Sequence, residues 1–205
     1  MKFILLLCGL LVQALPAAVF AEPPHVEKNS ALTNAVILII RHAEKSSYGS
    51  GLSADGVARA KAYVNYFRNF AVDGQKLKLD YLFAAADSKG SRRPRLTLEP
   101  TSEAFGLAID SRFRDRDFQG LADEIRSQPH GRVILIAWHH GEIPSLLRAL
   151  GADASQVFPK AKWPGDVYGW LIELRYDANG QLLGSRRINE NLLPADSSRA
   201  AVTAP

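Results

Sequence analysis

The stretch that decides the fold is Val36-Ile37-Leu38-Ile39-Ile40-Arg41-His42-Ala43-Glu44-Lys45. Its first five residues are apolar, and an unbroken apolar run is typical of a strand buried on both faces of a sheet. Charged residues begin abruptly at Arg41, where such a strand would end. Ligands of open α/β sheets bind outside the carboxyl ends of the strands. The pattern therefore predicts that Arg41 and His42 lie at the floor of a site. The alternative is an ordinary strand end with solvated charge.

A second stretch repeats this plan, namely Arg132-Val133-Ile134-Leu135-Ile136-Ala137-Trp138-His139-His140-Gly141. Again an apolar run of the buried type ends in histidine, and a helical pattern follows. If the two strands are neighbours in one sheet, His42 lies close to one of the two later histidines.

The other predicted elements alternate between strands and helices. Helices are expected at about 57–67, 95–107, 121–127 and 144–150, and strands at 36–40, 77–86, 132–138, 167–176 and 181–188. Ser53 or Asp55 is expected to cap the first helix, and Pro100 to disturb the second. Asn179-Gly180 favours a tight hairpin turn between the last two strands. This order predicts a three-layer α/β/α sandwich with a mainly parallel central sheet and a C-terminal β-hairpin.

The two ends of the chain are expected to lie outside the folded domain. Residues 1–21 combine a basic start, a short apolar core and small residues before a cleavage site, which is typical of a secretory signal peptide. The apolar core is too short for a membrane span, although an uncleaved anchor is the alternative. Residues 22–34 are expected to form an exposed lead-in, residues 35–190 one domain, and residues 191–205 a disordered tail.

Composition limits the chemistry further. The single cysteine, Cys8, lies within the expected signal peptide. The mature protein would then have no disulfide, no thiolate nucleophile and no Cys-ligated metal. Export without cysteine suits the bacterial periplasm. The net charge of +4 is mild, which fits a small anionic substrate and gives no argument for nucleic acid as a partner.

Four motifs in order resemble the histidine phosphatase superfamily, the phosphoglycerate-mutase-like proteins. Arg-His-Ala-Glu-Lys at 41–45 is followed by Leu-Ser-x-x-Gly-x-x-Arg-Ala at 52–60, by Arg93-x-x-x-Thr97, and by His140 after a late strand. The resemblance spans about residues 35–150. It implies the α/β/α fold given above, without the large helical cap of phytase-like members. It also implies phosphoryl transfer that needs no metal and no cofactor.

The resemblance implies a role for each motif. His42 is expected to attack phosphorus and form a phosphohistidine, with its other ring nitrogen fixed by a backbone carbonyl. Arg41 and Arg93 are expected to clamp the phosphoryl oxygens with forked, permanently charged guanidinium groups. Arg92 competes with Arg93, but the four-residue step to Thr97 favours Arg93; Arg92 and Arg95 are expected to be surface charge.

Two assignments stay open at this point. His140 is the expected second phosphate-contacting histidine because Gly141 follows it, and His139 is the alternative. The leaving alkoxide needs a proton from a carboxylic acid. Asp115, before the Asp117-Phe118-Gln119-Gly120 run, resembles the acid position of many family members, although the family more often has Glu there. Glu142, two residues after His140, is the alternative donor.

The first functional hypothesis is a metal-independent phosphomonoester hydrolase acting on a small, exported phosphorylated substrate. The second is a non-catalytic phosphate or phospho-ligand binding protein on the same fold. A metal hydrolase using His42, His139 and His140 is a third, but no His-x-His or His-x-x-x-His spacing supports it. Export makes glycolytic mutase activity implausible. The sequence names neither the substrate nor the oligomeric state.

Overall fold

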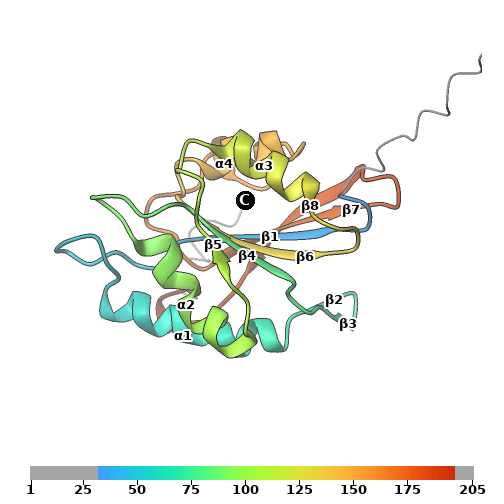
Figure 1. The fold of residues 1–205 in the computed structure, drawn as a ribbon. Helices are drawn as coiled ribbons and strands as arrows, with labels where there is room; N and C mark the ends of the chain where they lie inside the picture. The colour runs from blue at the N-terminus through green and yellow to red at the C-terminus, as the bar shows by residue number, and fades with distance from the viewer. Residues whose placement is uncertain (1–31, 197–205) are drawn as a thin grey trace, which may run out of the picture.

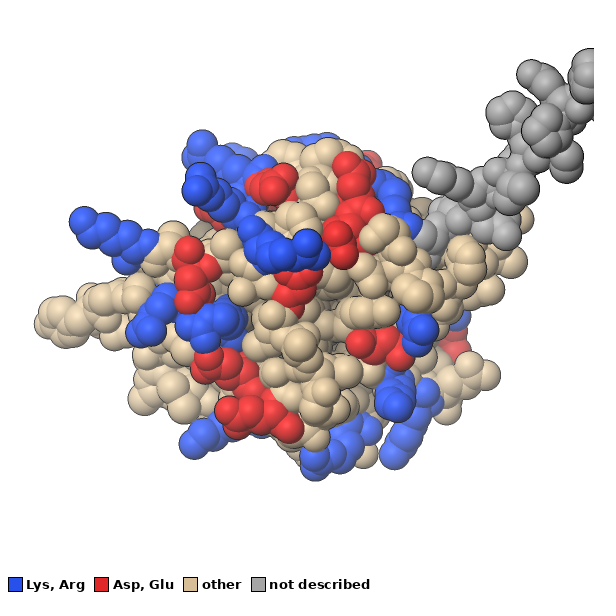
Figure 2. Space-filling view, in the orientation of Figure 1, with Lys and Arg blue, Asp and Glu red and all other residues tan. Residues whose placement is uncertain are grey.

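The computed structural model describes residues 32–196. The expected signal peptide at 1–21, most of the lead-in and the tail residues 197–205 lie outside this part of the chain. Within the described residues, no helix is long and apolar enough to cross a membrane. Figure 2 shows basic and acidic side chains interspersed over the viewed face, in keeping with the mild net charge of +4.

The centre of the fold is a six-stranded sheet in the order β5-β4-β6-β1-β7-β8 (Figure 1). Its strands are β1 (Val36–Arg41), β4 (Tyr81–Ala84), β5 (Ile109–Asp110), β6 (Val133–Trp138), β7 (Trp170–Tyr176) and β8 (Leu182–Asn189). β5, β4, β6 and β1 are parallel, whereas β7 and β8 run antiparallel to their neighbours. The mainly parallel sheet and the C-terminal hairpin are therefore confirmed.

Helices cover both faces of this sheet, which confirms the three-layer sandwich (Figure 1). One face carries α1 (Ala54–Arg68) and α2 (Arg93–Phe105), and the other carries α3 (Phe118–Ser127) and α4 (Ile143–Ala149). The short 3-10 helices η1 (Ala154–Gln156) and η2 (Pro159–Ala161) precede β7. Successive residues of a strand point to opposite faces. Accordingly, Ile39 packs in the core beneath α3 and α4, and Ile40 packs in the core beneath α1 and α2.

Several element boundaries differ from the sequence prediction. α2 begins at Arg93 and not at Arg95, because Pro94 lies in its first turn, where a missing backbone N–H costs nothing. The helix continues through Pro100 to Phe105 and ends at Gly106 in a left-handed conformation. β4 is shorter than the expected 77–86. The two-residue strands β2 (Ala71–Val72), β3 (Gln75–Lys76) and β5 were not expected at all.

The described ends of the chain contribute to the fold. Leu32, within the expected exposed lead-in, is 4% exposed and packs in the core beneath α3 and α4. Asp196, within the expected disordered tail, is 8% exposed. Both differences have a physical reason: Leu32 buries apolar surface, and the Asp196 carboxylate finds an arginine inside the protein.

Candidate active site

The site lies where β1 and β6 end side by side. The two strands are parallel, with Arg41 opposite Trp138, and the His42 N–H donates to Trp138 O at 2.9 Å. The chain after β6 then brings the His139 ring against the His42 ring, with centroids 5.1 Å apart and planes at 70°. The expectation that neighbouring strands bring His42 close to a later histidine is confirmed.

His42 is held as a neutral imidazole of one tautomer. Its Nδ1 lies 2.8 Å from Ala43 O. Because a carbonyl oxygen only accepts, Nδ1 carries the proton and Nε2 keeps its lone pair. Burial lowers the pKa of His42 to about 3, and the charges of Arg41 and Arg93 act in the same direction. The ring is therefore an unprotonated nucleophile at neutral pH, with the tautomer fixed by a backbone carbonyl as expected.

Thr97 joins the two motifs that carry His42 and Arg93. The Ala43 N–H donates to Thr97 Oγ1 at 2.8 Å, and the Thr97 hydroxyl donates to Arg93 O at 2.7 Å. A threonine four residues after Arg93 lies one helical turn further along α2, so its hydroxyl can reach both groups. This geometry explains the four-residue spacing between Arg93 and Thr97.

Arg41 is buried and its orientation is fixed by the loop before β7. Its Nη1 donates to Gly165 O at 2.9 Å and Val167 O at 2.8 Å, and its guanidinium lies 3.7 Å from the centroid of the Tyr168 ring. Burial lowers the pKa of Arg41 to about 10, so the group stays charged at neutral pH. Sequence reasoning missed these loop residues, which no motif marks apart from the irregular Trp163-Pro164-Gly165 stretch.

Arg93 enters the site from the start of α2. Its Nη1 donates to Gly90 O at 3.3 Å, while its buried Nε has no hydrogen-bond partner within the described residues. The buried Nε of Arg41 is likewise unpaired among those residues. Two arginines with unused buried donors beside a neutral histidine form a site suited to an anion.

The neighbouring arginines lie in different surroundings from Arg93. Arg92 is exposed at the N-cap of α2. Arg95 pairs with Asp87 at 2.8 Å and with Glu99. The charge of Arg93 lowers the pKa of His42.

His139 and His140 both lie beside the arginines. Burial lowers the pKa of His139, Arg41 and Arg93 add to this, and the Asp115 carboxylate opposes it. Burial also lowers the pKa of His140 to about 4, with Arg41 acting in the same direction. His139 is the histidine in ring contact with His42, whereas His140 lies close to the loop at Gly165. The assignment of His140 to the phosphate therefore stays a prediction.

The two candidate proton donors come from different segments, Asp115 from the loop before α3 and Glu142 from the start of α4. Asp115 is exposed, and its backbone carbonyl accepts a hydrogen bond of 3.0 Å from Trp138 Nε1, which anchors this loop to β6. Glu142 is half-buried at the start of α4 and lies 3.7 Å from Arg116 Nε. The Asp115 carboxylate raises the pKa of His139, in opposition to burial. The geometry keeps both carboxylates as candidates.

Comparison with known proteins supports the fold. The sequence matches no family model and no curated protein sequence. The structure is similar to a phosphoserine phosphatase mutant from Entamoeba histolytica in complex with phosphoserine, with 11% identity, a TM-score of 0.50, and coverage of 78% of this chain and 99% of that one. It is also similar to a protein from Escherichia coli assigned as an alpha-ribazole-5'-P phosphatase, with 13% identity, a TM-score of 0.50, and coverage of 77% and 97%.

These similarities define the class of fold. The structure neighbours are members of the histidine phosphatase superfamily, and the α/β sandwich described above is the phosphoglycerate-mutase-like fold. The chain therefore has this fold over nearly the full length of the proteins that it resembles. Among residues 32–196, no group of three or more His, Cys, Asp or Glu side chains could hold a metal ion.

Proposed function

We propose that the protein is a metal-independent phosphomonoester hydrolase that works through a phosphohistidine on His42. One observation carries the proposal above all others. The Nδ1–H of His42 is bonded to Ala43 O, so the lone pair of Nε2 is available in a buried site beside Arg41 and Arg93. Phosphoryl transfer needs little more than an in-line nucleophile and neutralisation of the phosphoryl oxygens.

The reaction proceeds in two steps. His42 Nε2 forms a bond to phosphorus while the bond to the ester oxygen breaks, and the leaving alkoxide takes a proton from a carboxylic acid. Asp115 is the proposed donor and Glu142 its alternative. Arg41 and Arg93 stabilise the charge on the transferring group, and His140 contacts the same oxygens. Water then attacks phosphorus, the bond from phosphorus to Nε2 breaks, and the carboxylate takes a proton from the water. This step releases inorganic phosphate and restores both neutral His42 and the carboxylic acid.

The proposed substrate is a small phosphomonoester outside the cytoplasm. The basic and apolar start of the chain supports export. The names of the two structurally similar phosphatases support a small phosphorylated substrate. Both neighbours share the fold at low identity, so neither supplies the substrate of this protein.

A panel of phosphate esters assayed with purified mature protein tests the proposal. We expect turnover of at least one ester, no loss of activity with a chelator, and no turnover by His42→Ala. His130→Ala is the matched control, because His130 is exposed in the turn before β6. Full activity of His42→Ala would exclude the mechanism. Phosphate binding without turnover of any ester would favour the alternative, a non-catalytic phospho-ligand binding protein.

A further inference from the structure

A buried ion cluster lies behind the active site. Arg59 of α1 is 1% exposed and forms a forked pair with Asp196, from Nη1 to Oδ2 at 3.0 Å and from Nη2 to Oδ1 at 2.6 Å. Its Nε donates to both oxygens of Glu44 at 3.1 Å, and its Nη2 donates to Glu44 Oε1 at 2.7 Å. Glu190 Oε2 lies 3.7 Å from Arg59 Nη1. One guanidinium on α1 thus joins the loop at Glu44 to the C-terminal segment that holds Glu190 and Asp196.

Through Arg59, this cluster reaches the loop that carries His42. Glu44 follows His42-Ala43 directly, and its backbone carbonyl accepts a hydrogen bond of 2.9 Å from Ser53 N. A Cβ at Gly56 would lie 2.4 Å from Glu44 O, so α1 packs tightly against this residue. The Glu44 carboxylate also opposes the effect of burial on the pKa of Arg41. Displacing Glu44 would therefore move the backbone that fixes the His42 tautomer.

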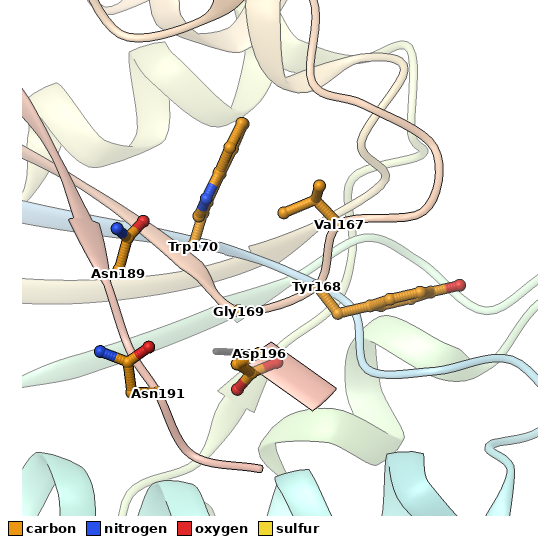
Figure 3. A pocket seen from close by; sticks show the side chains of 7 residues that line it. All are labelled: Val167, Tyr168, Gly169, Trp170, Asn189, Asn191 and Asp196. Atoms are coloured by element: carbon orange, nitrogen blue, oxygen red, sulfur yellow. The ribbon is translucent and has the colours of Figure 1, made fainter. Parts of the chain in front are cut away.

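Asp196 also contacts a second segment of the active site. A Cβ at Gly169 would lie 2.7 Å from the carboxyl carbon of Asp196. The preceding residue, Tyr168, packs against Arg41, and its ring centroid lies 6.4 Å from that of His42. Figure 3 shows Asp196 beside Gly169, on the side away from the Trp170 side chain. Asp196 Oδ2 also accepts from Leu192 N and Leu193 N at 2.9 and 3.0 Å.

We propose that Asp196 is a positioning residue for the active site, which holds the His42 loop through Arg59 and Glu44 and supports the Tyr168 segment at Gly169. The inference rests on the proposed function in that His42 is the group being positioned. It assigns a catalytic purpose to the C-terminal segment after β8, which contains none of the phosphate-binding motifs. Asp196 itself does not contact the substrate.

The His42 ring gives a readout that does not depend on turnover. In protein labelled with ¹⁵N at histidine, nitrogen NMR distinguishes the Nδ1–H tautomer from its alternative. We expect one Nδ1–H tautomer for His42 in the wild type. In Asp196→Asn, which weakens the charged pair with Arg59, we expect mixed tautomers or exchange broadening at His42. Asp196→Ser serves if Asp196→Asn does not fold, because its hydroxyl can still accept from Leu192 and Leu193 N–H.

Asp80→Asn is the matched control. Asp80 Oδ2 accepts from Val133 N at 2.9 Å, and Asp80 pairs with Arg132. It therefore joins a backbone N–H to an arginine, as Asp196 does, but at the opposite end of the parallel strands. We expect Asp80→Asn to lower stability and to leave the His42 signals unchanged. Unchanged His42 signals in Asp196→Asn, or equal changes in Asp80→Asn, would overturn the inference.

Kinetics separate this inference from the proposed function. A displacement of about 1 Å in a reacting group can cost ~100-fold in rate. We expect kcat of Asp196→Asn to fall by about 10- to 100-fold on an ester that the wild type hydrolyses, with KM little changed. A KM effect with unchanged kcat would overturn positioning of the nucleophile. A wild type that hydrolyses no ester would contradict the proposed function, while the NMR comparison would still decide the role of Asp196.

Discussion

Thr97→Val tests the hydrogen bond that connects α2 to the loop after β1, which carries His42. Thr97 and Ala43 are fully buried, and the Thr97 hydroxyl both accepts from Ala43 N at 2.8 Å and donates to Arg93 O at 2.7 Å. Valine keeps the β-branched shape of threonine but removes the hydroxyl. The substitution therefore leaves the Ala43 N–H buried without an acceptor, in the same residue whose carbonyl orients His42.

The expected loss of stability follows from that unpaired donor. Leaving a buried polar group unsatisfied costs about 1–3 kcal/mol, and we expect the free energy of unfolding to fall by this amount. The Arg93 carbonyl contributes less, because it can still accept from the helix backbone. Activity should fall together with stability, since the same hydrogen bond sets the distance between His42 and Arg93.

Thr101→Val is the control, one helical turn further along α2. Thr101 is also fully buried, but its hydroxyl has no hydrogen-bond partner in the described part of the chain. Replacing an unpaired buried hydroxyl by a methyl group removes a desolvation penalty, so this variant should be as stable as the wild type or more stable. Urea unfolding measures both variants. Equal stability of Thr97→Val and Thr101→Val would refute the reasoning.

Three further predictions concern the open assignments and the buried cluster. His140→Ala should weaken inhibition by inorganic phosphate more than His139→Ala, and the reverse order would move the phosphate contact to His139. Asp115→Asn should slow esters with poor leaving groups by about 10²–10⁴-fold and activated aryl esters far less; the same pattern in Glu142→Gln instead would assign the acid there. Burial raises the pKa of Glu190 to about 8 from its ordinary 4.5, so the folded state holds a proton that the unfolded state releases. Urea unfolding of the wild type and of Glu190→Gln at the same pH values isolates this effect, because the lowered pKa values of His42, His139 and His140 change stability in the opposite direction and act equally in both proteins. The stability of the wild type relative to Glu190→Gln should fall as pH rises from about 5 to 8, by at most ~1.4 kcal/mol per pH unit. A difference that does not change with pH would contradict this prediction.

The central strands and the site residues around them were predictable because they depend on local pattern. The apolar runs before Arg41 and His139 are long enough to specify buried strands, and parallel pairing then brings their ends together. The two-residue strands β2, β3 and β5 were not predictable, because two residues show no periodicity. α2 begins two residues before the predicted start, because Pro94 belongs to its first turn, where no backbone N–H is needed.

The groups that support the site were not predictable, because they come from distant parts of the chain. The carbonyls of Gly165 and Val167 that hold Arg41 lie in a loop with no motif. Asp196 is separated from Arg59 by 137 residues. Burial of Asp196 depends on the complete sheet and on α1, which no local pattern of the tail reveals. Arg59 and Glu44 both belong to recognised motifs, whereas Asp196 and Glu190 belong to none.

The most direct test of the account is to trap the phosphoryl group on the enzyme. Mature protein is mixed with a turned-over phosphate ester labelled in its phosphoryl group, quenched in alkali and mapped by peptide mass spectrometry. We expect an acid-labile, alkali-stable phosphate on the peptide that contains His42, with none in His42→Ala and the same amount in His130→Ala. Turnover by the wild type without any label on His42, or label that persists in His42→Ala, would contradict it.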